Sequence, residues 1–226
     1  MKIQIVSIPR SGSAYLTKLI SKKLELSTKT YSTSEIFNPL KQYNIENVLN
    51  NIKEYNSVIT KNQISHLLTT QQTTPDIYLQ FKKIEWFTVL LLRKDIFENT
   101  LSRCIAHLTG DWNNYNYTTE SFIEIDVDYF ISSLQETMAY WKVVKENLLE
   151  IEYNRVLYYE DLTFDPNIDF NHLNIFKEER NIQIFSAKSP SKYKIVKNVF
   201  ELKEISNNLT SMLDFQNIES VPYKEK

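Results

Sequence analysis

The stretch Lys2-Ile3-Gln4-Ile5-Val6-Ser7-Ile8-Pro9-Arg10-Ser11-Gly12-Ser13-Ala14-Tyr15-Leu16 decides the fold. Its first half carries the closely spaced apolar residues of a buried strand, Ile3, Ile5, Val6 and Ile8. Apolar residues then recur at helical spacing, at Leu16, Leu19, Ile20 and Leu24. The polar turn between the two patterns contains Gly12, one of only 2 glycines in the chain. The stretch therefore predicts a strand, a tight loop and a helix in succession.

Three more strands and two more helices are predicted downstream. The strands are Ser57–Thr60, Trp86–Leu92 and Arg155–Tyr159, and the second of these is almost continuously apolar, as suits a strand covered on both faces. Helical spacing marks one apolar face from Phe97 to Leu108 and another from Phe130 to Leu148. Strands that alternate with helices predict an α/β fold. We expect a three-layer, P-loop-like domain with a central parallel sheet flanked by helices.

The composition is that of one ordinary globular domain. The 226 residues are 42% hydrophobic and 24% charged, and we expect a single domain over residues 1–226. Lys plus Arg number 26 against 28 acids, so the chain as a whole does not attract nucleic acid or an anionic membrane. Met1–Ile8 is too short for a signal peptide core, and no apolar run reaches the roughly 18 residues of a membrane span, so we expect a cytoplasmic protein. The single cysteine, Cys104, excludes a cysteine-built zinc site and is expected to be a buried structural thiol.

The loop around Gly12 is a candidate anion site. A turn from strand to helix leaves the first helical N–H groups pointing outward, where they and the helix dipole attract an anion. Gly12 allows a phosphate to approach the backbone, and Ser11 and Ser13 add hydroxyl donors. The alternative is an ordinary N-cap serine in an α/β turn. A Walker A loop would end in Gly-Lys-Ser/Thr and a nucleophile elbow would have two glycines around its serine, and this loop has neither.

A second candidate anion site follows the strand Trp86–Leu92. Arg93 comes directly after that strand, and Ser102 lies on the helix that follows. Ligands of open α/β sheets bind beyond the carboxyl ends of the strands, so Arg93 and the Gly12 loop would face one crevice if their strands are neighbours. The planar fork of arginine suits a phosphate monoester. The alternative is that Arg93 pairs with Asp95 or Glu98 at the start of the helix.

Together these segments resemble the family of sulfotransferases that use 3′-phosphoadenosine 5′-phosphosulfate (PAPS), in particular the bacterial branch that includes trehalose sulfotransferase. Pro9-Arg10-Ser11-Gly12-Ser13 looks like the 5′-phosphosulfate loop of that family, and Leu92-Arg93-Lys94-Asp95 with Leu101-Ser102 looks like its 3′-phosphate segment. Tyr159-Glu160-Asp161-Leu162 is similar to a stretch found further along the same proteins. The three matches occur in the family's order, whereas Asn38–Lys83 shows much less resemblance.

The resemblance implies a nucleotide cradle. The 5′-phosphate would be held by the loop residues Ser11, Gly12, Ser13 and Ala14. Arg93 and Ser102 would hold the 3′-phosphate. Arg10 stands where the family has a basic residue beside the bridging oxygen, and it would stabilise charge as the sulfonate departs. Ala14 departs from the Thr or Ser usual at its position, which removes one hydroxyl donor.

Two further residues are assigned to the nucleotide by the resemblance. Tyr15 occupies a position where some members place an aromatic residue that stacks on adenine, with a core tyrosine as the alternative. Lys194, together with Lys188 and Lys192, lies where relatives close a basic loop over the 3′-phosphate. A solvated run of charge is the alternative for these lysines.

The resemblance also implies a base that removes the proton of the acceptor. Glu35 fits, because the bacterial branch places a glutamate at a similar separation from the loop; the alternative is a capping or solvated glutamate. Thr60-Lys61-Asn62 lies at a position similar to that of a Lys-Thr-His segment in other members. The resemblance therefore implies that Lys61 touches the sulfonate, whereas Asn62 cannot act as a base. His66 is the reserve candidate for the base, with a structural histidine as the alternative.

The sequence therefore predicts a PAPS-dependent sulfotransferase. It would move a sulfonate to a hydroxyl or amine of an acceptor, either a saccharide or a small metabolite, and it would need no metal, nucleic acid or membrane; the oligomeric state is left open. One alternative is a non-catalytic relative that binds PAPS or its product 3′-phosphoadenosine 5′-phosphate (PAP), suggested by Ala14 and Asn62. A small-molecule kinase is disfavoured by the missing Gly-Lys-Ser/Thr.

Overall fold

The computed structural model of the chain describes residues 1–25, 30–38, 45–110, 112, 122–147, 153–161 and 195–211. The described part contains a five-stranded sheet in the order β2-β3-β1-β4-β5, and every neighbouring pair of strands is parallel. The strands are β1 (Lys2–Ser7), β2 (Thr30–Ser34), β3 (Ser57–Gln63), β4 (Phe87–Leu92) and β5 (Arg155–Tyr158). The predicted α/β class with a parallel sheet is confirmed.

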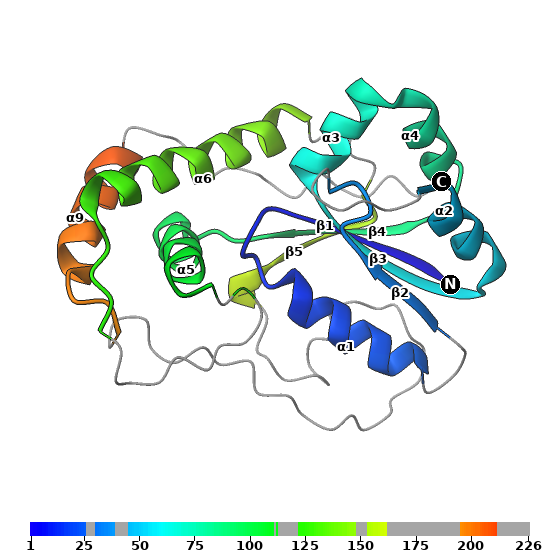
Figure 1. Cartoon of the computed structure of the whole chain (residues 1–226), viewed down its shortest axis with the longest axis horizontal. Coiled ribbons are helices and arrows are strands. Elements are labelled where there is room, and N and C mark those ends of the chain that lie inside the picture. The colour runs from blue at the N-terminus through cyan, green and yellow to red at the C-terminus, as the bar shows by residue number, and fades with distance from the viewer. Residues whose placement is uncertain are drawn as a thin grey trace.

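Helices cover both faces of this sheet. They are α1 (Ser13–Glu25), α2 (Ile45–Glu54), α3 (Ile64–Thr73), α4 (Pro75–Lys82), α5 (Ile96–Thr109), α6 (Val127–Asn147) and α9 (Val199–Thr210), with a short 3-10 helix η1 (Tyr159–Asp161) after β5. Figure 1 shows α1 on one face of the sheet and α2, α3, α4 and α6 on the other. The domain therefore has three layers. Within the described ranges, no helix combines the length and apolar character needed to cross a membrane.

Alternation of side chains along the strands divides the core into two clusters. In β1, Ile3 and Ile5 pack with Leu16, Leu19 and Ile20 of α1, while Val6 packs on the opposite side against the remaining helices. β4 alternates in the same way, because Val89 and Leu91 face α1 and Leu90 and Leu92 face away from it. Strands buried on both faces read as continuous apolar runs, which is why β1 and β4 were the clearest elements of the sequence.

Three predicted strand boundaries differ from the observed ones. β3 continues past Thr60 to Gln63, which places Lys61 at the end of the strand rather than after it. β4 begins at Phe87, one residue later than predicted, and the indole of Trp86 just before it donates from Nε1 to the Phe81 carbonyl at 3.0 Å. β5 ends at Tyr158, and Tyr159 already belongs to the 3-10 helix.

The strand order places a topological switch point, at which the strand connections diverge, beside the Gly12 loop. β1 and β4 are hydrogen-bonded neighbours, with Ser7 opposite Leu91. After β1 the chain continues to β2, near one edge of the sheet, and after β4 it continues to β5, at the opposite edge. Connections that diverge in this way open a crevice at the carboxyl ends of the two strands, where α/β proteins bind ligands. The condition that would bring Arg93 to the Gly12 loop is thus met.

Candidate functional site

The loop between β1 and α1 is held in a fixed shape by its own residues. Ser11 is fully buried, and its hydroxyl donates to the Ile8 carbonyl at 2.8 Å. Gly12 has φ 83°, and its carbonyl accepts the first helical hydrogen bond, from Leu16 N at 3.1 Å. The Ser11 hydroxyl therefore faces the loop itself, and the groups that point outward at this turn are the first backbone amides of α1.

Tyr159 explains why residue 12 is a glycine. A Cβ atom built on Gly12 would lie 2.6 Å from Cδ2 and 2.9 Å from Cε2 of the Tyr159 ring. Real Cβ atoms do not approach other heavy atoms this closely, and a φ of 83° is itself unfavourable for any residue with a side chain. The aromatic ring at the end of β5 thus packs directly on the loop at the end of β1.

Arg10 joins this loop to α5. Its guanidinium donates from Nε to Ser102 Oγ at 3.1 Å and from Nη1 to the Trp112 carbonyl at 2.6 Å. Ser102 is buried in the second turn of α5, so this contact reaches across 92 residues of sequence. The two segments that the sequence assigned to the 5′ and 3′ ends of one nucleotide are therefore brought together.

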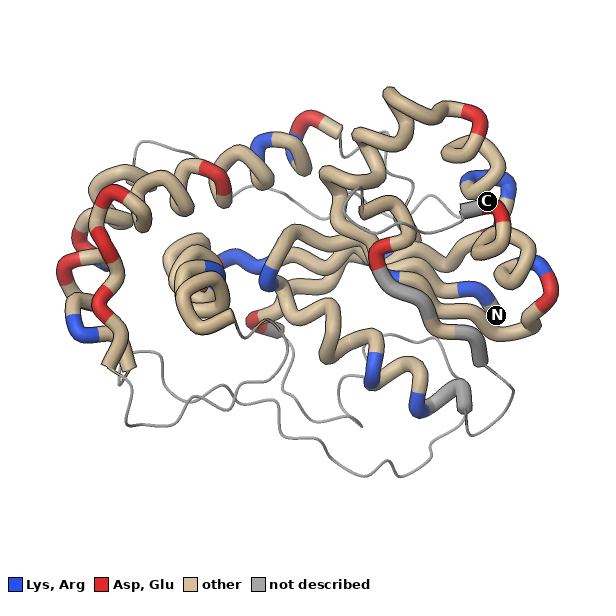
Figure 2. Tube along the Cα trace, viewed as in Figure 1, with Lys and Arg blue, Asp and Glu red and all other residues tan. Residues whose placement is uncertain are grey.

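Arg93 and Asn99 fasten the same loop from the β4 side. Arg93 donates from Nη1 to the Arg10 carbonyl at 3.2 Å, and Asn99 donates from Nδ2 to the Pro9 carbonyl at 3.0 Å. The Arg93 guanidinium also lies 4.3 Å from the centroid of the Tyr159 ring. Figure 2 shows the basic positions at the turn after β1 lying next to those at the start of α5.

The charge of Arg93 is balanced by two carboxylates. Nη2 lies 3.6 Å from Glu98 Oε2, and Nε lies 4.0 Å from Glu160 Oε1. Of the two acidic partners that the sequence offered, Glu98 is therefore a partner, while Asp95 caps α5 by accepting from Glu98 N at 2.8 Å. Only 7% of the Arg93 side chain is exposed, so a phosphate at this position would share the guanidinium with these acids.

Glu160 fills the anion position at the start of α5. Its carboxylate accepts from Lys94 N at 2.9 Å and from Asp95 N at 3.0 Å. Carboxylates are favoured there by the free amides and the helix dipole. Through Glu160, the Tyr159-Glu160-Asp161 stretch thus caps α5, a helix that lies much earlier in the chain.

Glu35 and Lys61 form a second cluster two strands away. Glu35 follows β2, and its Oε1 lies 3.5 Å from Lys61 Nζ, with the two side chains 17% and 16% exposed. Asn38 Nδ2 donates to Glu35 Oε2 at 3.0 Å, and Gln63 Nε2 lies 3.5 Å from Oε1. Neighbouring strands lie about 4.8 Å apart, so the ends of β2 and β1, with β3 between them, are separated by roughly 10 Å. The carboxyl end of the sheet thus carries Arg10, Glu35 and Lys61.

The backbone is strained at two of the predicted catalytic residues, Arg10 and Glu35. Among the described non-glycine residues, positive φ occurs at Arg10 (60°) and Glu35 (55°). The left-handed region costs an ordinary residue about 1–2 kcal/mol, and such strain concentrates at functional sites. This strain could not be predicted from the sequence, because neither residue is Asn, Asp or Gly.

The remaining predicted residues are placed less favourably. Tyr15 is partly buried against the core cluster on the α1 face, which agrees with the alternative that it is a core tyrosine. His66 lies in the first turn of α3, after β3, with its carbonyl accepting from Thr70 Oγ1 at 2.8 Å. Asn62 is fully buried and donates from Nδ2 to Thr60 Oγ1 at 3.3 Å. Lys194 lies outside the described residues, as do Lys188 and Lys192.

Several residues of the site were missed by sequence reasoning. Asn99 contacts the Pro9 carbonyl and Gln63 contacts Glu35, but an isolated amide in a helix or strand carries no distinctive pattern. The role of Tyr159 required knowing that β5 lies beside β4. The sequence signal that could have indicated this contact is the scarcity of glycine. Because the chain has only two glycines, a glycine at position 12 suggests that a larger residue does not fit there.

Two other predicted features concern cysteine and metals. Cys104 is fully buried in α5, and burial raises the pKa of its thiol, which confirms the expected structural cysteine. In the ranges that the structure describes, no three His, Cys, Asp or Glu side chains are grouped closely enough to hold a metal ion.

Comparison of the chain with models of protein families, and with curated proteins, finds no match. The site must therefore be interpreted from its own geometry and from the motifs that it contains.

Proposed function

We propose that this chain is a PAPS-dependent sulfotransferase whose nucleotide lies across the carboxyl ends of β1 and β4. The observation that carries the proposal is the contact between Arg10 Nε and Ser102 Oγ at 3.1 Å, reinforced by Arg93 on the Arg10 carbonyl. Two anion-binding motifs that are far apart in sequence meet through these bonds. A nucleotide with a phosphate at each end of its ribose requires this spatial relation.

In this proposal the β1–α1 turn acts as a phosphate loop, which would make the fold P-loop-like. The amides of Ser13 and Ala14 donate to the 5′-phosphate at the start of α1, where the helix dipole also favours an anion. Ser102 and Arg93 bind the 3′-phosphate, with Glu98 and Glu160 sharing the arginine. The acids limit how much net positive charge the phosphate meets, so we expect moderate rather than very tight binding.

Transfer of the sulfonate requires in-line attack by the acceptor. Arg10 stabilises the charge that develops on the bridging oxygen as its bond to sulfur breaks, and its strained backbone fixes the guanidinium on the loop. Glu35 accepts the proton of the attacking hydroxyl or amine. Lys61, paired with Glu35 at 3.5 Å, is close enough to the base to contact the transferred sulfonate.

A non-catalytic PAP-binding protein is the second candidate, and one observation favours it. Asn62 is fully buried at a position where the resemblance would have a histidine base, so this residue supplies no proton acceptor. The two candidates differ in Glu35: the enzyme needs it and the binding protein does not. The small-molecule kinase gains no support, because no lysine stands in the loop.

A transfer assay separates the two candidates. Radiolabelled PAPS would be incubated with panels of sugars, phenols and amines, and labelled products would be separated from the nucleotide. We expect transfer to at least one class, a loss of on the order of a hundredfold or more in Arg10→Ala, and much smaller loss in Arg10→Lys, which keeps the charge. If PAP binds but no panel is labelled by the wild-type chain, the non-catalytic alternative replaces the enzyme.

A further inference from the structure

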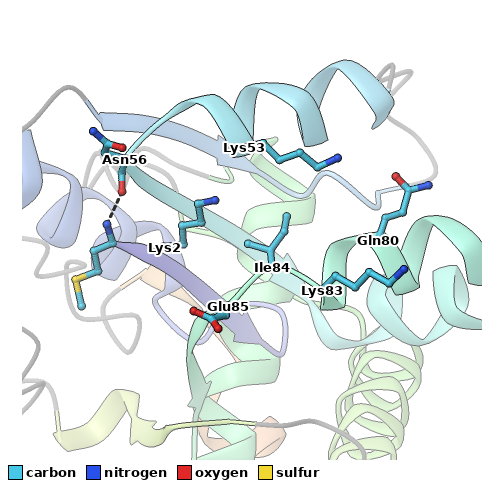
Figure 3. Close-up of a pocket in the computed structure, with 8 residues that line it drawn as sticks. Lys2, Lys53, Asn56, Gln80, Lys83, Ile84 and Glu85 are labelled. Carbon is cyan, nitrogen blue, oxygen red and sulfur yellow. Dashed lines mark hydrogen bonds between the residues drawn. The ribbon is translucent and has the colours of Figure 1, made fainter.

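A second concentration of charge lies at the opposite end of the sheet. A hollow of about 680 Å³ opens at the amino ends of β1, β3 and β4, beside the last turns of α2 and α4 (Figure 3). Its lining residues are Met1, Lys2, Lys53, Asn56, Gln80, Lys83, Ile84 and Glu85. β1 has 6 residues and rises about 3.3 Å per residue, which separates the hollow from the Gly12 loop by roughly 20 Å. The hollow is therefore distinct from the proposed active site.

The lining of this hollow carries uncompensated positive charge. Three lysine side chains face one glutamate side chain, Glu85, which leaves an excess of two positive charges among the lining side chains. Within the part of the chain that the structure describes, none of these four side chains forms an ion pair. Lysines elsewhere do find carboxylates, as Lys142 does with Glu146 and Lys197 with Glu124. Ammonium groups gathered without partners repel one another, and a bound anion would remove that cost.

Helix ends explain two of the lysines but not the third. Lys53 lies in the last turn of α2 and Lys83 is the C-cap of α4, where a cation is favoured by the helix dipole. Lys2 belongs to β1 and has no such reason to be there. Figure 3 shows the Lys53 and Lys83 side chains extending towards Gln80 from two sides, with the buried Ile84 between Lys83 and Lys2.

We propose that this hollow binds a small oxyanion that carries at least two negative charges, of phosphate or carboxylate chemistry. Lysine ammonium groups act as compact point charges with three donors each, and they accept either kind of oxyanion. The excess of two positive charges matches a dianion, and the Gln80 amide adds a neutral donor at the rim. The volume lies within the range of small-molecule sites, which leaves room for an organic body on the anion.

Backbone amide shifts of the full chain, labelled with ¹⁵N, provide the test. Pyrophosphate and citrate would be titrated separately at low ionic strength, with sodium chloride of equal ionic strength as the reference. We expect saturable shifts at Lys53–Asn56 and Gln80–Glu85; a larger response to pyrophosphate would assign phosphate chemistry, and a larger response to citrate would assign carboxylate chemistry. Amides of Gly12–Tyr15 report separately on the proposed nucleotide site, so failure of one site does not imply failure of the other.

Charge-matched variants identify the lysines responsible. A variant that combines Lys2→Gln, Lys53→Gln and Lys83→Gln should bind the more effective anion about tenfold more weakly or worse, because three charge contacts together supply that factor. The control Lys142→Gln, Lys197→Gln and Lys203→Gln loses the same total charge and should bind as the wild type does. Thermal melts show whether both are folded, and Lys2→Gln alone serves if the triple variant is not. Absent shifts at the hollow, or equal weakening in the control, would overturn the proposal.

Discussion

At the scale of the residue, unfavourable backbone angles and close packing gather in two short segments. Arg10 and Gly12 lie in one loop, and Glu35 lies two strands away, each with a φ between 55° and 83°. Surrounding contacts compensate for the cost, since Arg93 and Asn99 hold the loop and Asn38 holds Glu35. Such arrangements persist where a side chain must be aimed in a set direction, which accords with the catalytic roles proposed for Arg10 and Glu35.

Replacing Gly12 by alanine should destabilise the fold more than the same change at the chain's other glycine. Gly12→Ala meets both an unfavourable φ and the Tyr159 ring, at an expected cost of about 2–4 kcal/mol. Gly110→Ala is the matched control, because Gly110 also has a positive φ (69°) but no atom within 4 Å of the added methyl. It should cost only about 1–2 kcal/mol. Urea denaturation measures both, and equal losses would show that Tyr159 does not restrict position 12.

Replacing Glu35 by glutamine should abolish catalysis without abolishing nucleotide binding. The amide cannot accept the acceptor's proton, so turnover should fall by about 10²–10⁴ while PAP affinity stays unchanged. Initial rates with the acceptor found by the transfer assay provide the measurement, with Glu54→Gln at the end of α2 as the control. Near-normal turnover by a folded Glu35→Gln variant would transfer the role of base to His66.

At the scale of the element, the start of α5 is the junction of the site. β4 delivers Arg93 to it, β5 delivers Glu160, and the loop after β1 is tied to its first two turns through Asn99 and Ser102. Three parallel strands therefore converge on one helix terminus. A change in the capping of α5 should therefore alter the Gly12 loop, because Asn99 and Ser102 of the same helix hydrogen-bond to that loop.

Loss of the Glu160 carboxylate should loosen the start of α5. Glu160→Gln removes the negative charge of the carboxylate that accepts hydrogen bonds from Lys94 N and Asp95 N. We expect the opening free energy for hydrogen exchange of these two amides to fall by about 1–2 kcal/mol. Glu146→Gln on α6 is the control, since its exposed pair with Lys142 should contribute about 0.5 kcal/mol or less. Hydrogen exchange followed by NMR distinguishes them. Unchanged protection of Lys94 and Asp95 would mean that Glu160 does not cap the helix.

The elements that could be predicted from sequence are those with a strong apolar pattern. β1, β4, α5 and α6 were predicted because their burial leaves a clear period in the sequence. β2 (Thr-Tyr-Ser-Thr-Ser) was missed, because a short, polar edge strand has no such period. α3 and α4 were missed as well, since Thr and Gln interrupt the apolar face of α3 and α4 has only 8 residues. α2 was also missed, although Val48, Leu49 and Ile52 give it a buried apolar face.

The same limit applies to the candidate site. Arg10, Gly12 and Arg93 were found because they sit at strand ends within recognisable motifs, and the pairing of Glu35 with Lys61 followed from strand order that no local pattern contains. The contact between Arg93 and Glu160 was the least predictable feature. Glu160 is 67 residues beyond Arg93 in sequence, and only the pairing of β4 with β5 brings them together.

At the scale of the whole molecule, the two ends of one parallel sheet carry different chemistry. The carboxyl end gathers residues from all five strands, from Glu35 after β2 to Glu160 after β5. The amino end carries the three lysines of the proposed oxyanion site. The central claim is that the carboxyl end binds a nucleotide with phosphates at both its 5′ and its 3′ positions.

Calorimetric titration of PAP against AMP tests that claim most directly, because the two ligands differ only in the 3′-phosphate. We predict micromolar-range binding of PAP and at least tenfold weaker binding of AMP. Ser102→Ala should weaken PAP by about 0.5–1.5 kcal/mol, and Glu98→Gln, which removes a competing acid from Arg93, should strengthen it. Neither variant should alter AMP binding. Equal affinity for AMP and PAP, or a Glu98→Gln variant that is folded and binds PAP no better, would contradict the account.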